Sequence, residues 1–544
     1  MNMIFNPKFE LNHYLPDTSL FSFSTYLTAM AILILAYTIT EPLYRFRLAV
    51  SFVPFKFTFW LMAAIGLATL LIDLGTVNQW TLFSFIGNHI IWQGVFGALF
   101  LIMILTWIWT AFITPPIFSR TNYKKFSNLV YHVILRGDEH QLSVIAYELR
   151  NSMDAIVKSA RSVDQKISTK EVNKNRIEAV GPYAQEFLLM MGNRKLCRHI
   201  VASSTVTAMC LFHAIKKYKK YDLPVGQFSR NILVEGLINK DSILYHEDSA
   251  YYSGIIGYQK PFSRTIYGDY EMVEALTLNQ NSLFDINYEV TESWDSKQLE
   301  AYCNCVLLTI ESYINSDSFP RKSMAIAQAI NKVQESCRDL YKLNNSPEDC
   351  FNDMTSRLRV AVRFIETIIN LFDETPVFSG RSYRRADNFY EQIAEFMFEI
   401  IKHAAEIKSP PSKCWSIHFI SIWHTFFCNF YQTEAWKIIR HKLCRLIYKK
   451  VYQMNEFPDH QSAKVLGFCL NIIGLEEQKG KSYSSLHRLL LRWVKNNYLN
   501  LISEQPLLAE SCLIGDLRID KKNHCLIKTW GSWMEDPQQQ FMYY

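Results

Sequence analysis

Charged side chains are scarce in the first 119 residues of this 544-residue chain. Only eight occur there, four positive and four negative, so the net charge of +6 belongs to residues 120–544. The whole chain is 49% hydrophobic, 20% charged and 14% aromatic, which excludes the disordered and low-complexity classes. A mean hydropathy of −0.02 is too low for a polytopic transporter and high for a soluble enzyme. We therefore expect two unlike parts.

Cysteine is absent from residues 1–196, and the 12 cysteines lie between Cys197 and Cys525 at irregular spacing. Free thiols without a pairing pattern are typical of a reducing compartment and exclude a disulfide framework. The chain also lacks the phosphate-loop, dinucleotide, zinc-protease, nucleophile-elbow and CxxC signatures. We expect no enzyme activity, no cofactor and no metal, although an enzyme with a site assembled from distant segments remains an open alternative.

Three long apolar runs, separated by the few charges, fill the N-terminal part. They cover about residues 21–41, 55–74 and 90–114. Each approaches the ~20 residues that a helix needs to cross ~30 Å of hydrocarbon. The sequence therefore predicts a membrane module over residues 1–119 with three transmembrane helices.

The positions of the basic residues predict the orientation of this module in the membrane. The segment between the first two runs carries Arg45, Arg47 and Lys56, whereas residues 73–89 contain no Lys or Arg. Lys and Arg are retained on the cytoplasmic side. We expect a multi-pass protein of the cell inner membrane, with the N-terminus outside and residues 120–544 in the cytoplasm, and no removable signal peptide.

Polar and small side chains interrupt the second and third runs. Because such groups are costly against lipid, we expect them to face protein or water. Two interpretations stay open: they line a pore formed by an oligomer, or they pack helices together. The candidates are Gly66, Thr69, Asp73, Asn88, His89, Gln93, Gly97, Thr106 and Thr110.

Residues 120–544 show helical periodicity in one segment after another, as in Leu142, Ile145 and Leu149. We predict a large cytoplasmic domain of mainly α-helices, arranged as a helical array, so that the fold class is that of an all-α membrane protein. The segment 223–290 differs, since it is rich in glycine and aromatic residues. It divides the domain into a membrane-proximal helical unit (120–222), a small irregular or mixed insert (223–290) and a C-terminal helical unit (291–544).

Basic clusters beside aromatic residues are the best ligand candidates. Arg forks bind phosphates, and aromatic rings stack on bases. The candidates for a phosphate-bearing ligand, such as a nucleotide or oligonucleotide, are Lys260, Arg264, Arg381, Tyr383, Arg384 and Arg385. The basic run 216–220 ends a predicted helix, and we expect it to face solvent or lipid.

One metal-like cluster also occurs, with Cys414, His418, His424 and Cys428 on one helical face. The two cysteines would lie ~21 Å apart along a straight helix, too far for one metal ion. We therefore expect a buried helix with hydrogen-bonded histidines.

At the level of architecture alone, three spans followed by a large cytosolic helical domain resemble membrane effectors of bacterial defence systems. The first hypothesis is an oligomeric effector or ion channel, active in antiviral defence, whose cytoplasmic domain senses an anionic ligand or a protein partner and gates the spans. The second is a membrane-tethered scaffold that docks a protein partner. The expected partners are membrane lipid and further copies of the chain, with a cytosolic anionic ligand or protein.

Overall fold

A computed structural model provides the fold, and it is mainly helical. It describes residues 21–39, 41–51, 55–77, 89–109, 113, 115–161, 174–247, 252–253, 257–258, 261–344, 352–372, 387–428, 433–532 and 536–544. The chain divides into two compact units. Unit 1 comprises Met1–Arg161 and Ile167–Met190, and unit 2 comprises Ser162–Lys166 and Met191–Tyr544.

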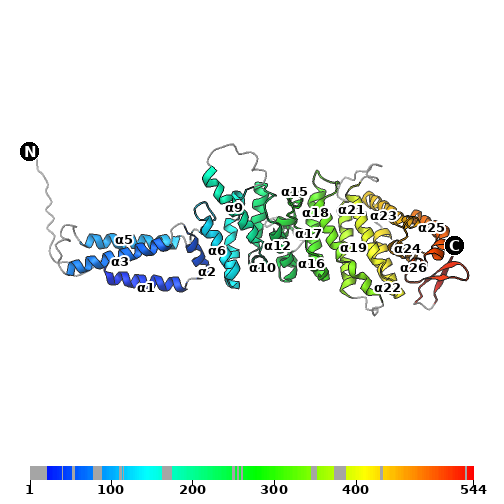
Figure 1. The fold of residues 1–544 in the computed structure, drawn as a ribbon, viewed down its shortest axis with the longest axis horizontal. Helices are drawn as coiled ribbons and strands as arrows, with labels where there is room; N and C mark the ends of the chain where they lie inside the picture. The colour runs from blue at the N-terminus through cyan, green and yellow to red at the C-terminus, as the bar shows by residue number, and fades with distance from the viewer. Residues whose placement is uncertain are drawn as a thin grey trace, which may run out of the picture. The chain divides into compact units, whose positions relative to one another are not determined.

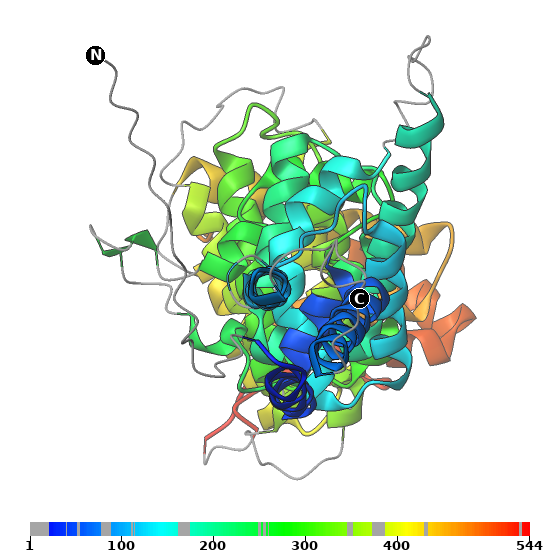
Figure 2. The ribbon, with the colours of Figure 1, turned by 90° about the vertical axis from the view of Figure 1, so that its left-hand side faces the viewer.

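Unit 1 contains the apolar helices and the helices that follow them (Figure 1). Its helices are α1 (Phe23–Ile39), α2 (Pro42–Val50), α3 (Phe55–Val77), α5 (His89–Ile108), α6 (Tyr123–Arg136), α7 (Glu139–Leu149), the 3₁₀ helix η2 (Arg150–Ser152), α8 (Met153–Ser159) and α9 (Lys174–Met191, which ends one residue beyond the unit). The blue helices α1, α3 and α5 are seen along their axes in Figure 2. Helix α3 packs against both α1 and α5, while α2 packs against α6 and α7.

Two of the apolar helices are long and apolar enough to cross a membrane. These stretches are Phe57–Gly75 in α3 and Ile90–Ile108 in α5, and only 33% and 11% of them are buried. A core helix of a soluble protein would be mostly buried, so this exposure favours contact with lipid. Helix α1 contains the shorter apolar stretch Phe23–Ile34. The prediction of three spans is thus supported for two helices and not confirmed for α1.

Unit 2 is built mainly from amphipathic helices that pack in pairs, such as α10 with α12, α17 with α19 and α21 with α23. The helices run from α10 (Arg194–Ser203) through α11 (Thr205–Tyr218), α12 (Gly226–Ile238), α13 (Ile243–His246), α14 (Pro261–Tyr267), α15 (Tyr270–Leu278), α16 (Tyr288–Glu292), α17 (Ser296–Ile314), α18 (Met324–Glu335), η4 (Arg338–Leu343), α19 (Asp353–Leu371), α21 (Phe389–Ala404), α22 (Pro411–Trp415), the π-helix η6 (Ser416–Cys428), α23 (Glu434–Tyr452), η7 (Gln453–Asn455), α24 (His460–Ile473) and α25 (Ser484–Glu504) to α26 (Pro506–Ser511).

Side-chain caps explain where several of these helices begin. The Asp295 carboxylate accepts a hydrogen bond from the Gln298 backbone N–H, and Gln298 Oε1 accepts one from the Asp295 N–H, which completes a capping box at α17. Asn388 and Asp459 cap α21 and α24 in the same position. Behind each cap, apolar residues recur every three or four positions and form the buried stripe that the periodicity predicts.

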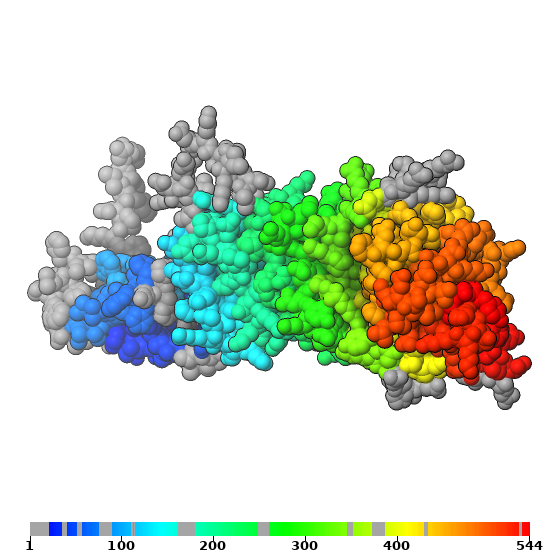
Figure 3. Space-filling view, turned by 45° about the vertical axis from the view of Figure 1, so that its right-hand side comes forward, coloured from blue at the N-terminus to red at the C-terminus, as the bar shows by residue number. Residues whose placement is uncertain are grey.

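A three-stranded antiparallel sheet ends the chain, and the sequence did not predict it. Its strands are β3 (Leu517–Asp520), β4 (Cys525–Trp530) and β5 (Gln538–Tyr543), with β4 in the centre and Leu526 opposite Met542. In the space-filling view the red C-terminal residues lie beside the orange α25 and α26 (Figure 3). The C-terminal unit is therefore mainly, but not wholly, helical.

The segment 223–290, predicted as an irregular insert, is largely helical where it is described. It contains α12 to α15, the start of α16 and a short antiparallel hairpin of β1 (Tyr252–Ser253) and β2 (Gly257–Tyr258). Gly236 permits close packing in this segment, because a Cβ atom there would lie 2.7 Å from the Leu244 side chain.

Candidate functional site

The interior of the three apolar helices is a tight seam around Tyr26. The Tyr26 hydroxyl donates a hydrogen bond of 2.9 Å to the Met62 carbonyl, and its ring lies 5.6 Å from that of Phe100. A Cβ atom on Gly66 would overlap the Tyr26 ring, so glycine permits this close approach of α1 and α3. Gly97 is close to Phe21 in the same way, at 3.3 Å.

One end of this seam is polar and centres on Asp73. Its carboxylate accepts hydrogen bonds from the Phe23 backbone N–H at 2.7 Å and from Gln93 Nε2 at 3.1 Å. The side chain of Gln93 is buried, and its Oε1 atom has no hydrogen-bond partner among the described residues. Asp73 therefore joins α1, α3 and α5 at one end of the bundle.

The candidate residues of the spans thus occupy different positions. Gly66, Asp73 and Gln93 contact other helices of the same chain, and Gly97 lies near Phe21, which precedes α1. Thr69 is buried, with its hydroxyl bonded to the Gly66 carbonyl. Thr106 is exposed on α5 and bonds to the Ile102 carbonyl. Asn88 and Thr110 lie outside the described residues, as does the side chain of His89 at the first position of α5.

Unit 2 has a pocket of about 480 Å³ between α11, α14 and α17. Its lining residues are His213, Lys216, Arg264, Thr265, Gly268, Asp269, Leu308, Glu311, Ser312 and Asn315. This volume is in the range of small-molecule sites. Gly268 permits the turn that closes α14, because a Cβ atom there would lie 2.5 Å from the Arg264 carbonyl oxygen. The turn places Asp269, the N-cap residue of α15, at the pocket wall.

Each cation of this pocket faces a carboxylate. Lys216 forms an ion pair with Asp269, and Arg264 Nη2 lies 3.7 Å from Glu311 Oε2. The side chains of Lys216 and Glu311 are 59% and 47% exposed, and ion pairs in contact with solvent contribute only about 0–1 kcal/mol. A phosphate group, which accepts charge-assisted hydrogen bonds from Lys and Arg, can therefore compete with these carboxylates.

Of the predicted phosphate-binding residues, the structure places Arg264 in this pocket. Lys260, Arg381, Tyr383, Arg384 and Arg385 lie outside the described residues. Sequence reasoning missed Lys216, which it assigned to solvent or lipid, and also the two carboxylates. The spacing in the chain gives no sign of these neighbours, because Lys216, Arg264 and Glu311 come from three different helices.

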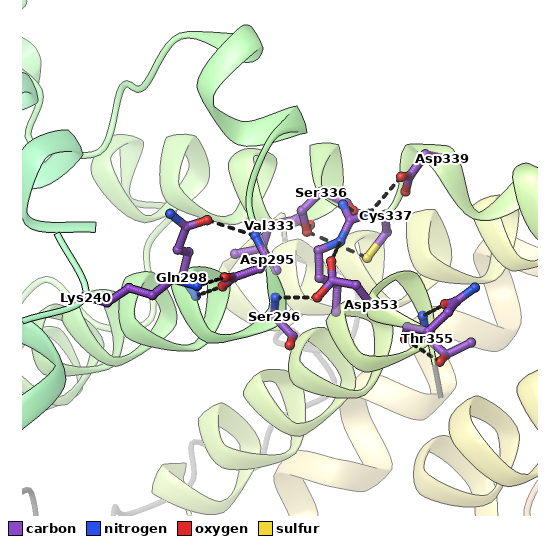
Figure 4. Close-up of polar contacts among 12 residues, drawn as sticks. Lys240, Asp295, Ser296, Gln298, Val333, Ser336, Cys337, Asp339, Asp353 and Thr355 are labelled. Atoms are coloured by element: carbon purple, nitrogen blue, oxygen red, sulfur yellow. Dashed lines mark hydrogen bonds and ion pairs between the residues drawn. The ribbon is translucent and has the colours of Figure 1, made fainter. Parts of the chain in front are cut away.

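A second polar cluster surrounds the buried Arg357, and Figure 4 labels its partners Ser336, Asp339 and Asp353. Its guanidinium donates to Asp353 at 3.0 Å, to Asp339 at 2.7 Å and to the Ser336 carbonyl at 2.6 Å. Asp353 in turn accepts from the Ser296 backbone N–H at 2.9 Å. The cluster thus ties the N-termini of α17 and α19 to η4. Only about 70 Å³ of space adjoins Arg357, so we assign the cluster to the fold.

The cysteine–histidine segment forms the π-helix η6 and the helix before it. His418 is fully buried and Cys414 is buried, whereas His424 is exposed. The Nε2 atom of His418 is 2.9 Å from the Ala404 carbonyl oxygen, and burial lowers the His418 pKa to about 4. Within the described parts of the chain, no three metal-binding side chains come together. The predicted buried histidine is found at position 418 and not at 424.

The chain was compared with protein-family models, with curated proteins and with solved structures, and none of the three comparisons gives a match.

Proposed function

We propose that this chain is a membrane-anchored helical receptor whose unit 2 binds a small phosphate-bearing ligand. The observation that carries the proposal is the pocket between α11, α14 and α17, where Lys216 and Arg264 meet in about 480 Å³ of space. Both cations hold partly exposed carboxylates that a phosphate can replace. The same exchange breaks the ion pair that joins Lys216 of α11 to Asp269, the N-cap residue of α15, and so gives the ligand a route to change the helix packing of unit 2.

The outer surfaces of α3 and α5 support the anchoring part of the proposal. Asp73 and Gln93 pair between α3 and α5, while large apolar side chains of both helices are exposed. The exposed set comprises Phe57, Phe59, Trp60, Leu67, Leu71, Leu74, Ile91, Val95, Leu99, Leu101, Ile102, Leu105 and Ile108. Exposure of this much apolar surface is stable in a bilayer and unstable in water. Helix α1 completes the proposed three-span bundle through the Tyr26 seam.

The distribution of Lys and Arg supports the topology that we propose. Basic residues lie between α1 and α3 and follow α5, and none lies between α3 and α5. Because Lys and Arg are retained on the cytoplasmic side, this pattern supports a topology with the N-terminus outside and unit 2 on the cytoplasmic side of the cell inner membrane. Maleimide labelling of the cysteines in intact cells tests it, since all of them lie beyond residue 196. Labelling by an impermeant reagent before lysis would contradict the topology.

The effector form of the proposal adds oligomerisation and gating, as in antiviral defence. Asp73 and Gln93 pair within one chain, so an ion path would have to form between chains. The test is ion flux from liposomes that contain the purified protein, with and without ligand. Flux that depends on ligand supports a channel. If no ion flux occurs with or without ligand while the ligand still binds, the protein is a receptor that signals through a conformational change and not a channel.

Ligand binding is tested on the full chain in detergent by isothermal titration with ATP and with pyrophosphate. Replacement of Arg264 by glutamine is expected to weaken binding at least about tenfold, because a charge-assisted hydrogen bond contributes about 1.5–3 kcal/mol. The matched control is Lys217→Gln, which removes the same charge from the position next to Lys216 but outside the pocket lining. Equal affinities for both variants and the wild type would contradict the pocket assignment.

The membrane-tethered scaffold is the competing function. It predicts that neither phosphate compound binds, and that an unrelated single-span anchor in place of residues 1–119 leaves the capture of a protein partner unchanged. Light scattering of the purified protein measures the number of chains per particle. The effector hypothesis requires more than one chain, whereas the scaffold hypothesis permits a monomer.

A further inference from the structure

Unit 1 has a groove at the point where the apolar helices meet the helices that follow them. It measures about 270 Å³ and lies between α2, α6 and α7. The lining residues are Pro42, Arg45, Phe46, Ala49, Leu129, Val133, Gln141, Val144 and Ile145. Apart from Arg45 and Gln141 the lining is apolar. The groove has room for a segment of an acyl chain.

The position of α2 sets the depth of this groove relative to a bilayer. Ile39 ends α1 and Pro42 begins α2, so at 3.8 Å per Cα step they lie no more than about 11 Å apart. Only four residues separate the end of α2 from the start of α3. If α1 and α3 cross the membrane, α2 must lie at the interface between them.

Two ion-paired contacts hold α2 against α7. Arg47 donates to Glu148 through Nε at 3.0 Å and through Nη2 at 2.6 Å, with both side chains largely buried. Phe46 packs edge-on against Phe126 of α6, with ring centroids 5.7 Å apart. These contacts hold α2 against α6 and α7, which form the groove. Arg45 lies on the exposed side of α2.

Exposed cations flank the apolar lining of the groove. Lys125, Leu129, Val133 and Arg136 are spaced by four, four and three residues, so they share one face of α6. The two cations are exposed at either end of the apolar lining, and Arg45 adds a third from α2. No carboxylate is among the lining residues. An apolar groove flanked by cations at a bilayer surface matches an anionic lipid.

We propose that this groove binds an anionic glycerophospholipid, with an acyl segment between α2, α6 and α7 and the phosphate near Arg45 and Lys125. The inference rests on the membrane anchoring in the proposed function and adds a specific lipid to it. A bound lipid would link the bilayer to α7 through the helix pair that Arg47 and Glu148 already join.

The test is native mass spectrometry of the full chain in detergent, with phosphatidylglycerol or phosphatidylcholine added at equal concentration. We expect the wild type to retain phosphatidylglycerol preferentially. Each of Arg45→Gln and Lys125→Gln should reduce its retention about fivefold, the effect of one cation near a charged surface. Lys124→Gln is the matched control, because it removes the same charge from the adjacent position, off the groove face of α6, and should leave retention unchanged.

A second variant separates groove binding from surface attraction. Ala49→Phe fills the groove without changing charge and should remove the bound lipid, while thermal unfolding of the variant checks that unit 1 still folds. Equal retention of phosphatidylglycerol by the wild type, Arg45→Gln and Ala49→Phe would overturn the proposal. So would photo-crosslinking from the groove to a protein instead of a lipid.

Failure here and failure of membrane anchoring give different results. A chain that alkaline carbonate releases from membranes would contradict both proposals. A chain that resists carbonate extraction but binds the two lipids equally would contradict only the lipid site.

Discussion

Replacement of His418 by glutamine is expected to remove much of the acid sensitivity of unit 2. His418 is fully buried in η6, its ring is 4.7 Å from that of Phe468, and its Nε2 atom bonds to the Ala404 carbonyl. The Nδ1 atom has no partner among the described residues. Protonation there would place a charge in an apolar core, so burial holds the His418 pKa at about 4.

The sign and size of the effect follow from this pKa. The unfolded chain takes up a proton at His418 near pH 6.5, whereas the folded chain does so only near pH 4. The contribution to stability is therefore complete above pH 6.5 and is lost as the pH falls toward 4. At about 1.4 kcal/mol per pKa unit, about 3 kcal/mol is lost in total, and about 2 kcal/mol at pH 5.

The assay is urea unfolding of the full chain in detergent at pH 7 and at pH 5, monitored by circular dichroism. Burial also lowers the pKa of His403 and His487, so the wild type loses more than the His418 share. The informative quantity is therefore the difference between wild type and variant. His424→Gln, an exposed histidine on the same helix, is the control. If His418→Gln loses as much stability at pH 5 as the wild type, the assignment of the buried neutral histidine is wrong.

Three further predictions concern packing and ion pairs. Gly66→Leu should destabilise the apolar bundle by about 1–3 kcal/mol, because the leucine would overlap the Tyr26 ring. Thermal unfolding in detergent measures this loss, and Ala63→Leu at an exposed position of the same helix should leave stability unchanged. Glu148→Gln should cost about 3 kcal/mol, because it breaks a largely buried pair with Arg47, and hydrogen exchange in α2 should rise. Arg357→Met should cost a similar amount and speed exchange at the start of α19. Unchanged exchange in either variant would show that these pairs do not hold the helices.

The sequence predicts the helices of this protein well because their signal is local. The runs that become α3 and α5 contain few charges, and the stripe Leu142, Ile145, Leu149 repeats at the helical period and is buried in α7. The polar residues of the apolar helices could be identified only as candidates, either for a pore or for helix contacts. The bond between Gln93 and Asp73 could not, since it depends on how α3 and α5 are rotated.

Other features depend on contacts that no spacing encodes. The α11–α14–α17 pocket joins Lys216 and Arg264 from separate helices, so composition alone could identify only Arg264. The C-terminal sheet escaped prediction because its strands are short and β5 begins with Gln538-Gln539-Gln540, which lacks an apolar alternation. The π-helix of His418 repeats at a wider period than the α-helix assumed for the cluster.

The bonds made by Asp73 are compatible with stepwise assembly of the bundle during synthesis. The chain is made from the N-terminus, so the Phe23 N–H is available to Asp73 as soon as α3 is complete, whereas Gln93 emerges 20 residues later. Helices α1 and α3 can therefore associate first and hold the carboxylate partly satisfied. Helix α5 can then add its glutamine to a carboxylate that already has one hydrogen-bond donor.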